Sequence, residues 1–267
     1  MNIIIISVVS VTALGFICSS ILSVVSKLMY VKIDERIALL TEIMPGANCG
    51  ACGYPGCSGY ASALVTDNAK TNLCTPGGAA VLAKISSILG VEAGSIESKI
   101  AVVSCKGDCK TQKKKSEYRG LQSCAAAKQL YSGENSCAFG CLGYGDCRTV
   151  CPSGAICMEN NLARIIPALC TGCGICVKTC PNKLITIESA DRSVFILCKN
   201  IEKGAVTRKK CSSGCIACTK CVRECPEQAI SMKDNLAVID YDKCSDCRRC
   251  VEVCMTKCIG LVRQPVV

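Results

Sequence analysis

The sequence predicts an α+β protein that consists of an N-terminal transmembrane helix, a small helical module and two tandem cysteine-rich domains. Three observations support this prediction: a long uncharged segment near the N-terminus, 28 cysteines among 267 residues, and a cysteine pattern that returns after 74 residues. We expect a membrane anchor over 1–30, a four-cysteine module over 31–92, a linker over 93–118, and the two domains over 119–192 and 193–267.

The uncharged segment predicts a helix that spans a membrane. Residues 3–26 carry no charge, and about twenty apolar residues are enough to cross a bilayer. A cleaved signal peptide would carry basic residues before its apolar core, whereas here they follow it, at Lys27, Lys32 and Arg36. The positive-inside rule then predicts a single-pass anchor in the cell membrane, with the bulk of the chain on the cytoplasmic side.

Cysteine runs with regular spacing predict iron–sulfur clusters. The spacing C-x2-C-x2-C-x3-C occurs in runs that begin at Cys170, Cys215 and Cys244. This is the run of two-cluster bacterial ferredoxins, in which the fourth cysteine ligates the other cluster of the pair. Disulfides are disfavoured because cytoplasmic thiols stay reduced, and a zinc site does not account for runs of four with a trailing proline. We therefore predict [4Fe–4S] clusters and electron transfer.

The runs belong to a duplicated domain. An offset of 74 residues aligns Cys124 with Cys198 and the later runs with each other, and no gap is needed from about Arg119 to the last residue. Stretches of β-type composition follow the runs, as at 184–189 and 236–241. Each copy therefore resembles a bacterial-type 2[4Fe–4S] ferredoxin domain, in which the clusters cross-link a small apolar core.

The ferredoxin pattern assigns the ligands of four clusters, because three cysteines of one run share a cluster with the fourth of the partner run. In the second copy the sets are Cys215, Cys218, Cys221 and Cys254, and Cys244, Cys247, Cys250 and Cys225. In the first copy one set is Cys170, Cys173, Cys176 and Cys151. The other set lacks a member, because Tyr144 stands where a cysteine is expected. Either this site is short of a ligand or, as we predict, Cys137 completes a set with Cys141, Cys147 and Cys180.

A different set of cysteines lies closer to the membrane segment. It comprises Cys49, Cys52, Cys57 and Cys74. Glycine at positions 50, 53 and 56 allows the backbone to wrap closely around a metal centre. This set predicts a small helical module that holds one [4Fe–4S] cluster, the fifth in the chain.

The remaining cysteines leave a sixth cluster open. Cys105, Cys109 and Cys124 are candidates to begin one, and the candidates for its fourth ligand are Cys137, Cys198 and Cys211. Three further cysteines are expected to pack as small apolar side chains, namely Cys18, Cys157 and Cys258.

The formal net charge of +10 does not by itself predict an anionic partner, because it ignores thiolates that bind iron. Two basic groups, at 113–115 and 208–210, are candidates to dock an acidic ferredoxin, with a solvated surface as the alternative. Nucleic acid is not expected as a partner, because aromatic residues are few and Trp is absent. Nucleotide-binding glycine motifs and histidine are absent too, so the chain needs partners to turn electrons into hydride.

The order of these modules resembles the B subunit of the Rnf-type ion-translocating oxidoreductase complexes, most specifically in the GACGYPGC segment that follows a membrane helix. The resemblance implies that the chain takes electrons from reduced soluble ferredoxin and passes them to membrane and flavoprotein subunits, towards NAD, coupled to Na⁺ or H⁺ transport. We expect the distal ferredoxin domains to accept electrons and the Cys49–Cys74 module to pass them towards the membrane. The alternatives are a membrane-anchored polyferredoxin of a hydrogenase or dehydrogenase complex, and a metal-storage or zinc-scaffold protein without redox turnover.

Overall fold

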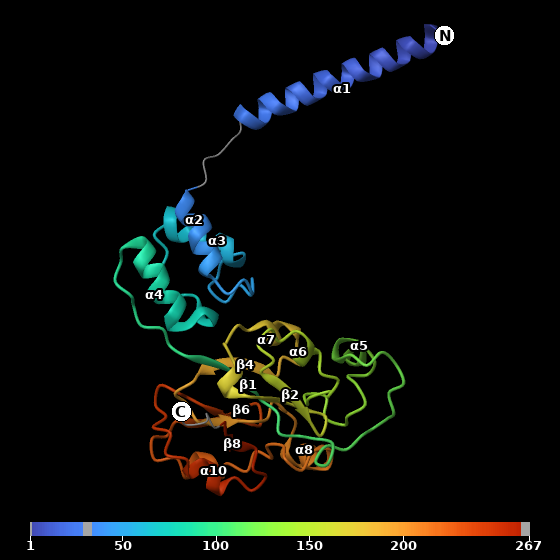
Figure 1. The fold of residues 1–267 in the computed structure, drawn as a ribbon. Coiled ribbons are helices and arrows are strands. Elements are labelled where there is room, and N and C mark those ends of the chain that lie inside the picture. The colour runs from blue at the N-terminus through green and yellow to red at the C-terminus, as the bar shows by residue number, and fades with distance from the viewer. Residues whose placement is uncertain (1, 29–33, 263–267) are drawn as a thin grey trace.

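The computed structural model describes residues 2–28 and 34–262, which form three parts in chain order (Figure 1). A long helix, α1, stands apart, a group of short helices follows it, and the remaining chain forms a compact body of short strands and helices. Lys32, one of the basic residues that predict the orientation in the membrane, lies outside the described residues.

Helix α1 (Asn2–Leu28) is long and apolar enough to cross a membrane. Its window Ile5–Leu28 has a mean hydropathy of 2.3, and none of it is buried against the rest of the protein. The polar side chains of α1 bond to its own backbone, as where the Thr12 hydroxyl donates to the Val8 carbonyl at 2.9 Å. Such bonds remove unpaired donors from an apolar environment. The helix is therefore suited to lipid, as the sequence predicts.

The helical module contains α2 (Glu35–Ile43), α3 (Gly56–Thr66), a 3₁₀ turn (Thr75–Gly77) and α4 (Gly78–Leu89). The Asp34 carboxylate caps α2 by accepting a bond from the Arg36 backbone N–H at 2.9 Å. Leu40, Tyr60 and Ile85, one from each α-helix, are fully buried and form the centre of a small apolar core. This core holds the loop between α2 and α3, which carries Cys49 and Cys52.

Two units of similar structure make up the compact body. The first unit (residues 99–190) contains β1 (Lys99–Val103), α5 (Cys124–Gln129), α6 (Asp146–Thr149), β2 (Ile156–Glu159), β3 (Leu162–Ile165), a 3₁₀ turn (Pro167–Leu169), α7 (Ile175–Thr179) and β4 (Ile185–Ser189). The second unit (residues 193–262) contains β5 (Val194–Ile196), α8 (Gly204–Lys210), α9 (Lys220–Arg223), β6 (Ile230–Lys233), β7 (Leu236–Ile239), α10 (Arg249–Val253) and β8 (Ile259–Leu261).

Each unit has the same strand pairing. In the first unit β1 pairs antiparallel with β4, and β2 forms a hairpin with β3. In the second unit β5 pairs with β8, and β6 forms a hairpin with β7. The predicted β-type stretches are confirmed as β4 and β7, and short helices begin inside the cysteine runs. The α+β fold with tandem ferredoxin domains is confirmed.

The internal repeat is shorter than the sequence suggests. From Cys137 onwards the offset of 74 holds, since β2, β3, α7 and β4 each have a counterpart 74 residues later. Before Cys137 the offset of 74 does not hold. Val103 of β1 pairs with Ile185, and Ile196 of β5 pairs in the same way with Ile259, so β1 and β5 correspond at an offset of 93. A strand of the first unit therefore lies within the segment predicted as a linker.

The first strand joins the two units. Lys99 apart, β1 is buried throughout, because its two faces serve different cores. Ala101 and Val103 pack inside the first unit, whereas Ile100 and Val102 pack against Phe195 of the second unit. This double burial explains the unbroken apolar run IAVV, which lacks the alternation of a half-exposed strand. The two units therefore form one body.

Candidate iron–sulfur sites

The helical module brings its four predicted cysteines together. Burial raises the pKa of the Cys74 thiol, and the neighbouring thiols of Cys57, Cys52 and Cys49 raise it further. The glycines at 50, 53 and 56 all have positive φ, as the expected wrapping of the backbone requires. Gly56 also leaves room for the Asn48 amide oxygen, which accepts a bond from the Cys57 N–H at 2.8 Å. The loop is thereby closed around the thiols.

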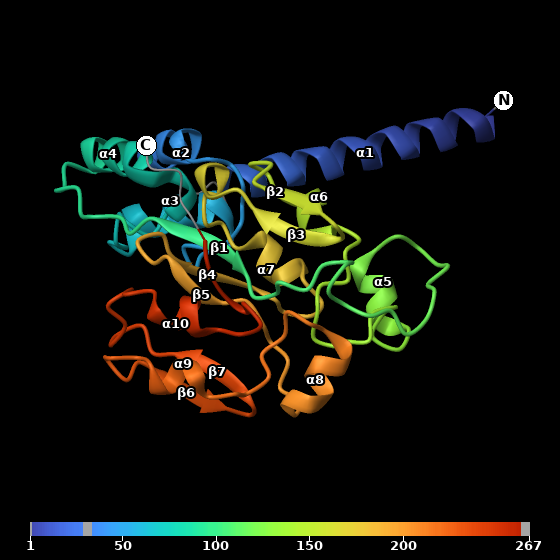
Figure 2. The same cartoon turned by 90° about the horizontal axis from the view of Figure 1, so that it is seen from below.

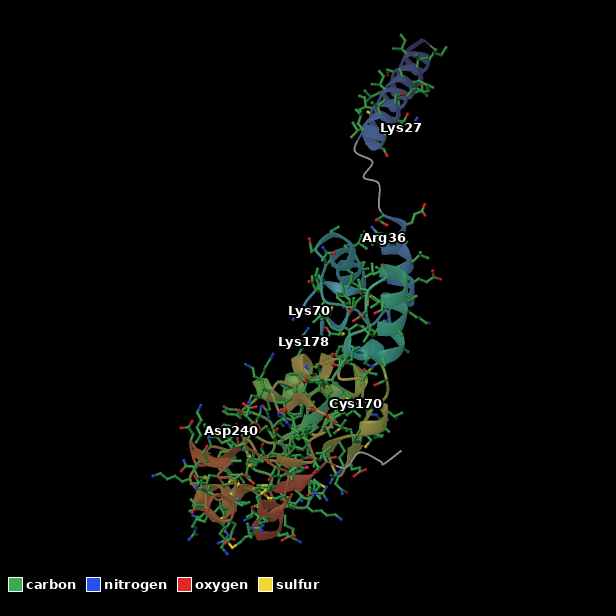
Figure 3. All side chains as sticks on the ribbon, turned by 90° about the vertical axis from the view of Figure 1, so that its left-hand side faces the viewer. Lys27, Arg36, Lys70, Cys170, Lys178 and Asp240 are labelled. Atoms are coloured by element: carbon green, nitrogen blue, oxygen red, sulfur yellow. The ribbon has the colours of Figure 1, made fainter. Side chains whose placement is uncertain are left out.

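A direct contact joins this module to the first unit. The Lys178 ammonium on α7 donates to the backbone carbonyl of Cys49 at 3.0 Å. Lys178 stands between Cys176 and Cys180, so it connects the cysteines of the module with those of the first unit. Figure 3 shows Lys178 where the helical module meets the compact body.

Three of the four ferredoxin-type sets gather as predicted, and in each of them burial and the neighbouring thiols raise the pKa of one cysteine. Burial and three neighbouring thiols raise the pKa of Cys176 to about 11, and those neighbours are Cys173, Cys170 and Cys151. The pKa of Cys221 is raised to about 11 in the same way, beside Cys215, Cys218 and Cys254. The third set surrounds Cys250, whose pKa is also raised to about 11, beside Cys244, Cys247 and Cys225.

Backbone N–H groups donate to the sulfur atoms of cysteines that end a ferredoxin-type run. The N–H of Leu184 donates to Cys180 Sγ at 3.4 Å, and the N–H of Ala229 donates to Cys225 Sγ at 3.3 Å. In both cases the donor is four residues after the cysteine, so the turn that follows the run repeats between units. Hydrogen bonds to cluster sulfurs stabilise the thiolate form and tune the reduction potential.

The fourth set differs from the prediction, because the structure places Cys124 rather than Cys137 beside it. One small cavity of about 20 Å³ is lined by Cys124, Cys141, Cys147 and Cys180. Burial and the neighbouring thiols, Cys124 among them, raise the pKa of Cys147 to about 12. Tyr144 does not line this cavity, and its ring packs at 64° to that of Tyr118 instead. The helix α5, which has no counterpart among the described residues of the second unit, supplies the missing thiol.

Asp146 holds Cys124 in this position. Its carboxylate accepts bonds from the N–H groups of Cys124 and Ala125 at 2.9 and 3.0 Å, and from the Ser123 hydroxyl at 2.9 Å. Burial opposes ionisation of Asp146, but these bonds outweigh it and lower the pKa of the carboxyl group. The residue before Cys147 therefore anchors the start of α5 over the same cavity.

Replacing Asp146 with alanine is expected to weaken this site without emptying it. Loss of a charged acceptor leaves three donors unpaired, and one such bond is worth about 1.5–3 kcal/mol. We expect iron to be lost to an added chelator about tenfold faster, the factor that corresponds to about 1.4 kcal/mol. Asp146→Asn keeps one acceptor oxygen, so its rate of iron loss should lie between those of the wild type and the alanine variant. Equal rates in all three proteins would contradict a role for Asp146 in holding Cys124.

Cys137 lies in a second cavity, together with cysteines that the sequence left unassigned. That cavity is lined by Cys105, Cys137, Cys198 and Cys211, two from each unit. Cys109 is exposed and does not line it. The candidates Cys105, Cys109 and Cys124 therefore do not lie together. The sequence feature that could have linked Cys105 with Cys198 is their position, because each stands two residues after the first strand of a unit.

Of the three cysteines expected to pack as apolar side chains, only one is fully buried. Cys258 is buried, as expected, and corresponds at the 74-residue offset to Leu184, which is also buried. Its sulfur lies 3.6 Å from Cys254 Sγ, so it also contacts a predicted ligand. Cys157 is only half-buried and lies on the β2–β3 hairpin, with its sulfur 3.7 Å from the Arg164 carbonyl. Cys18 is exposed on α1, where lipid is its expected surroundings.

The donor sets of these sites consist of cysteine alone, the residue that ligates [4Fe–4S] clusters. Thiols that burial and like charge keep protonated lose their protons when they bind iron, which fits an all-cysteine donor set.

Comparison with protein families finds the same kinds of site. Residues 44–76 match a family described as a putative Fe–S cluster, and residues 169–230 and 214–258 each match a 4Fe–4S dicluster domain. The match at 169–230 covers cysteine runs that the strand pairing places in different units. The sequence patterns thus identify the clusters, and the fold decides which runs belong together.

Similar proteins cover almost the whole chain. It is 41% identical over 261 residues, 97% of this chain and 78% of the relative, to the B subunit of the Na⁺-translocating ferredoxin:NAD⁺ oxidoreductase complex of Acetobacterium woodii. The chain belongs to the B-subunit family of ion-translocating oxidoreductases. The B subunit of the proton-translocating ferredoxin:NAD⁺ complex of Clostridium ljungdahlii is 38% identical over 97% of this chain and 91% of its own length. The B subunit of the ion-translocating complex of Methanosarcina acetivorans is 36% identical over 96% of this chain and 97% of its own length.

Membership of the B-subunit family establishes the class of function. The chain is an iron–sulfur electron-transfer subunit of an oxidoreductase complex and works with other subunits of that complex. This favours the expected function over the two alternatives, a polyferredoxin of a hydrogenase and a zinc scaffold.

Proposed function

We propose that this chain accepts electrons from reduced soluble ferredoxin at a basic surface of the compact body. It then passes them, through the helical module at the membrane, towards the membrane and flavoprotein subunits that reduce NAD and move Na⁺ or H⁺. In this proposal α1 anchors the chain in the cell membrane and the rest lies on the cytoplasmic side, because Lys27, Lys32 and Arg36 follow the apolar segment.

The observation that carries the proposal is the meeting of two basic groups from different units. We call Lys113, Lys114, Lys115, Arg208 and Lys209 the basic surface. The Lys113 N–H donates to the Lys210 carbonyl at 2.9 Å, and the Ser212 N–H donates to the Thr111 carbonyl at 3.0 Å, so the two segments run side by side. Residues nearly a hundred positions apart thereby form one cationic surface.

Part of this surface is free to meet a partner. Lys114 forms an ion pair with Glu134 at 3.1 Å, whereas no ion pair is found for Lys113, Arg208 or Lys209 among the described residues. All three are exposed. Exposed charges of one sign increase the rate at which an oppositely charged protein associates, and salt screens this effect. Basic residues that are merely solvated need not lie close together, whereas a docking surface needs its charges in one place.

The membrane-facing part lies at the other end of the molecule. Figure 3 shows Lys27, Arg36, Lys178 and Asp240 in that order from α1 towards the far side of the compact body. The Cys49–Cys74 set therefore lies between α1 and the two units, in contact with α7 through Lys178. A bound [4Fe–4S] cluster supplies one-electron exchange, which thiolates alone do not. The residues of the chain hold the thiolates, donate N–H groups to sulfur and exclude water.

Reversing two charges of the basic surface tests the docking proposal. In Arg208→Glu/Lys209→Glu we expect the rate of reduction by ferredoxin to fall about 10- to 100-fold at low ionic strength, since steering changes association rates by about 10–10³. The variant and wild type should converge as salt is added. Lys233→Glu/Lys257→Glu makes the same charge change at exposed residues elsewhere in the second unit and should have a much smaller effect. Equal rates in both variants would refute docking here.

A further inference from the structure

We propose that Cys105, Cys137, Cys198 and Cys211 bind a sixth [4Fe–4S] cluster between the two units. These cysteines line one small cavity of about 20 Å³, the same size as the cavities that two of the ferredoxin-type sets line. The inference goes beyond the proposed function, because it concerns the cofactor content of the chain and not its electron donor.

Equivalent positions of the two units supply the four thiols. Cys105 and Cys198 follow β1 and β5 by two residues, and Cys137 and Cys211 precede the first cysteine of the next run by four. The contacts repeat as well. Cys105 Sγ accepts a bond from the Cys141 N–H at 3.4 Å, and Cys198 Sγ accepts one from the Cys215 N–H at 3.3 Å. The site therefore has the approximate twofold symmetry of the two units.

The segments that carry these cysteines are paired with each other. Gln112 of the first unit forms a β-bridge with Cys211 of the second, and the neighbouring backbone bonds at Lys113 and Ser212 extend it. Figures 1 and 2 show α5 and α8, which lie within these segments, on the same side of the compact body. Both segments supply residues to the cavity, Gln112 and Cys137 from the first unit and Thr207 and Cys211 from the second.

Buried polar groups surround the sulfur atoms. Asn200 is only 1% exposed, and its amide nitrogen lies 3.5 Å from Cys137 Sγ while its backbone N–H donates to Cys198 Sγ at 3.5 Å. Gln112 is also buried and lines the cavity, and its amide nitrogen donates to the Gly107 carbonyl. A purely apolar contact between four cysteines does not require such donors, because burying an amide costs free energy unless it is paired.

Positive charge lies beside the four thiols. Binding of iron releases one proton from each thiol and leaves four thiolates around the iron. Lys106 and Lys199, which also line the cavity, supply positive charge against these thiolates. All four cysteines are free thiols and thus available as ligands.

Iron and sulfide content of the anaerobically prepared full chain, reconstituted with iron and sulfide, tests this inference. Six clusters predict about 24 iron atoms per chain, whereas five predict about 20. The variant Cys105→Ser/Cys211→Ser, which removes one ligand from each unit, is expected to drop to about 20. A matched control, Cys109→Ser/Cys157→Ser, should stay at about 24, because neither residue belongs to any of the six sets. EPR spectra of the reduced proteins should show one signal fewer in the test variant only.

Two results would overturn the sixth cluster. One is a wild-type count of about 20, with zinc or a disulfide found at these cysteines. The other is an equal count in both double variants. Should the test variant misfold and lose more than one cluster, the wild-type count still decides, since five sites hold no more than about 20 iron atoms. The measurement uses neither ferredoxin nor the complex, so its failure leaves the docking proposal untouched.

Discussion

Ferredoxin-dependent NAD reduction by the complex is expected to stop when Cys52 is replaced by alanine. Cys52 belongs to the set that lies between α1 and the two units, and Lys178 connects this set to α7. Loss of an outer-shell partner of a metal site already costs about 10–100-fold, so loss of a ligand should cost at least about a hundredfold. Visible bleaching of the remaining clusters by reduced ferredoxin should persist, because their ligands are intact.

Measuring both NAD reduction and cluster bleaching distinguishes a broken electron-transfer route from a misfolded protein. Cys157→Ala, which changes a cysteine outside every set, should leave both turnover and bleaching at wild-type levels. If turnover survived in Cys52→Ala while one cluster's iron was missing, the Cys49–Cys74 set would not lie on the route to the membrane. If bleaching by ferredoxin also failed in Cys52→Ala, ferredoxin would be docking at the helical module rather than at the basic surface.

Replacing Cys124 with serine is expected to remove one whole cluster, about four iron atoms and four sulfides per chain. Cys124 lines the cavity of Cys141, Cys147 and Cys180, where the sequence alone favours Cys137. Three ligands hold a cluster less firmly than four, and the buried thiols left behind would return to their protonated form. Cys137→Ser should instead affect the proposed site between the units and leave EPR signals of the first unit unchanged.

A second change should restore the cluster by a different route. Tyr144 corresponds to Cys218 of the second unit, which lies in the complete set around Cys221. Tyr144→Cys in the Cys124→Ser background is therefore expected to return the iron content to the wild-type value. Two results would show that the predicted set with Cys137 is the correct one. One is that Cys124→Ser leaves the iron content unchanged. The other is that Cys137→Ser loses as much iron as Cys124→Ser and the same EPR signal.

Cysteine spacing predicted the sites where all ligands come from short, regular runs. The sets around Cys176, Cys221 and Cys250 gather as expected, because two residues between ligands force the thiols to the same side of a tight turn. The set of the helical module gathers for a similar reason, since glycines with positive φ close its loop. In these places local geometry decides the structure, and local geometry can be predicted from sequence.

The assignment of Cys124 and Cys137 could not be predicted in this way. The offset of 74 aligns Cys124 with Cys198, yet the strand pairing makes Cys105 the counterpart of Cys198. The insertion before Cys137 is longer in the first unit than in the second, and the helix α5 lies in the additional length. An alignment at a fixed offset cannot detect an insertion that carries its own cysteine. The inserted cysteine is simply aligned with a cysteine of the other unit, although the two are not structurally equivalent.

By itself, the sequence predicted the cofactor class, an apolar helix long enough to span a membrane, the duplicated α+β domain and the cysteine sets that lie within regular runs. Only the tertiary structure decided which distant cysteines share a cavity, that the linker contains the first strand of a unit, and that two basic groups form one surface. The physical reason is the range of the interactions. Ligand spacing and helix length are local, whereas the positions of Cys124 and Cys137 depend on strand pairing and on the packing of one unit against the other.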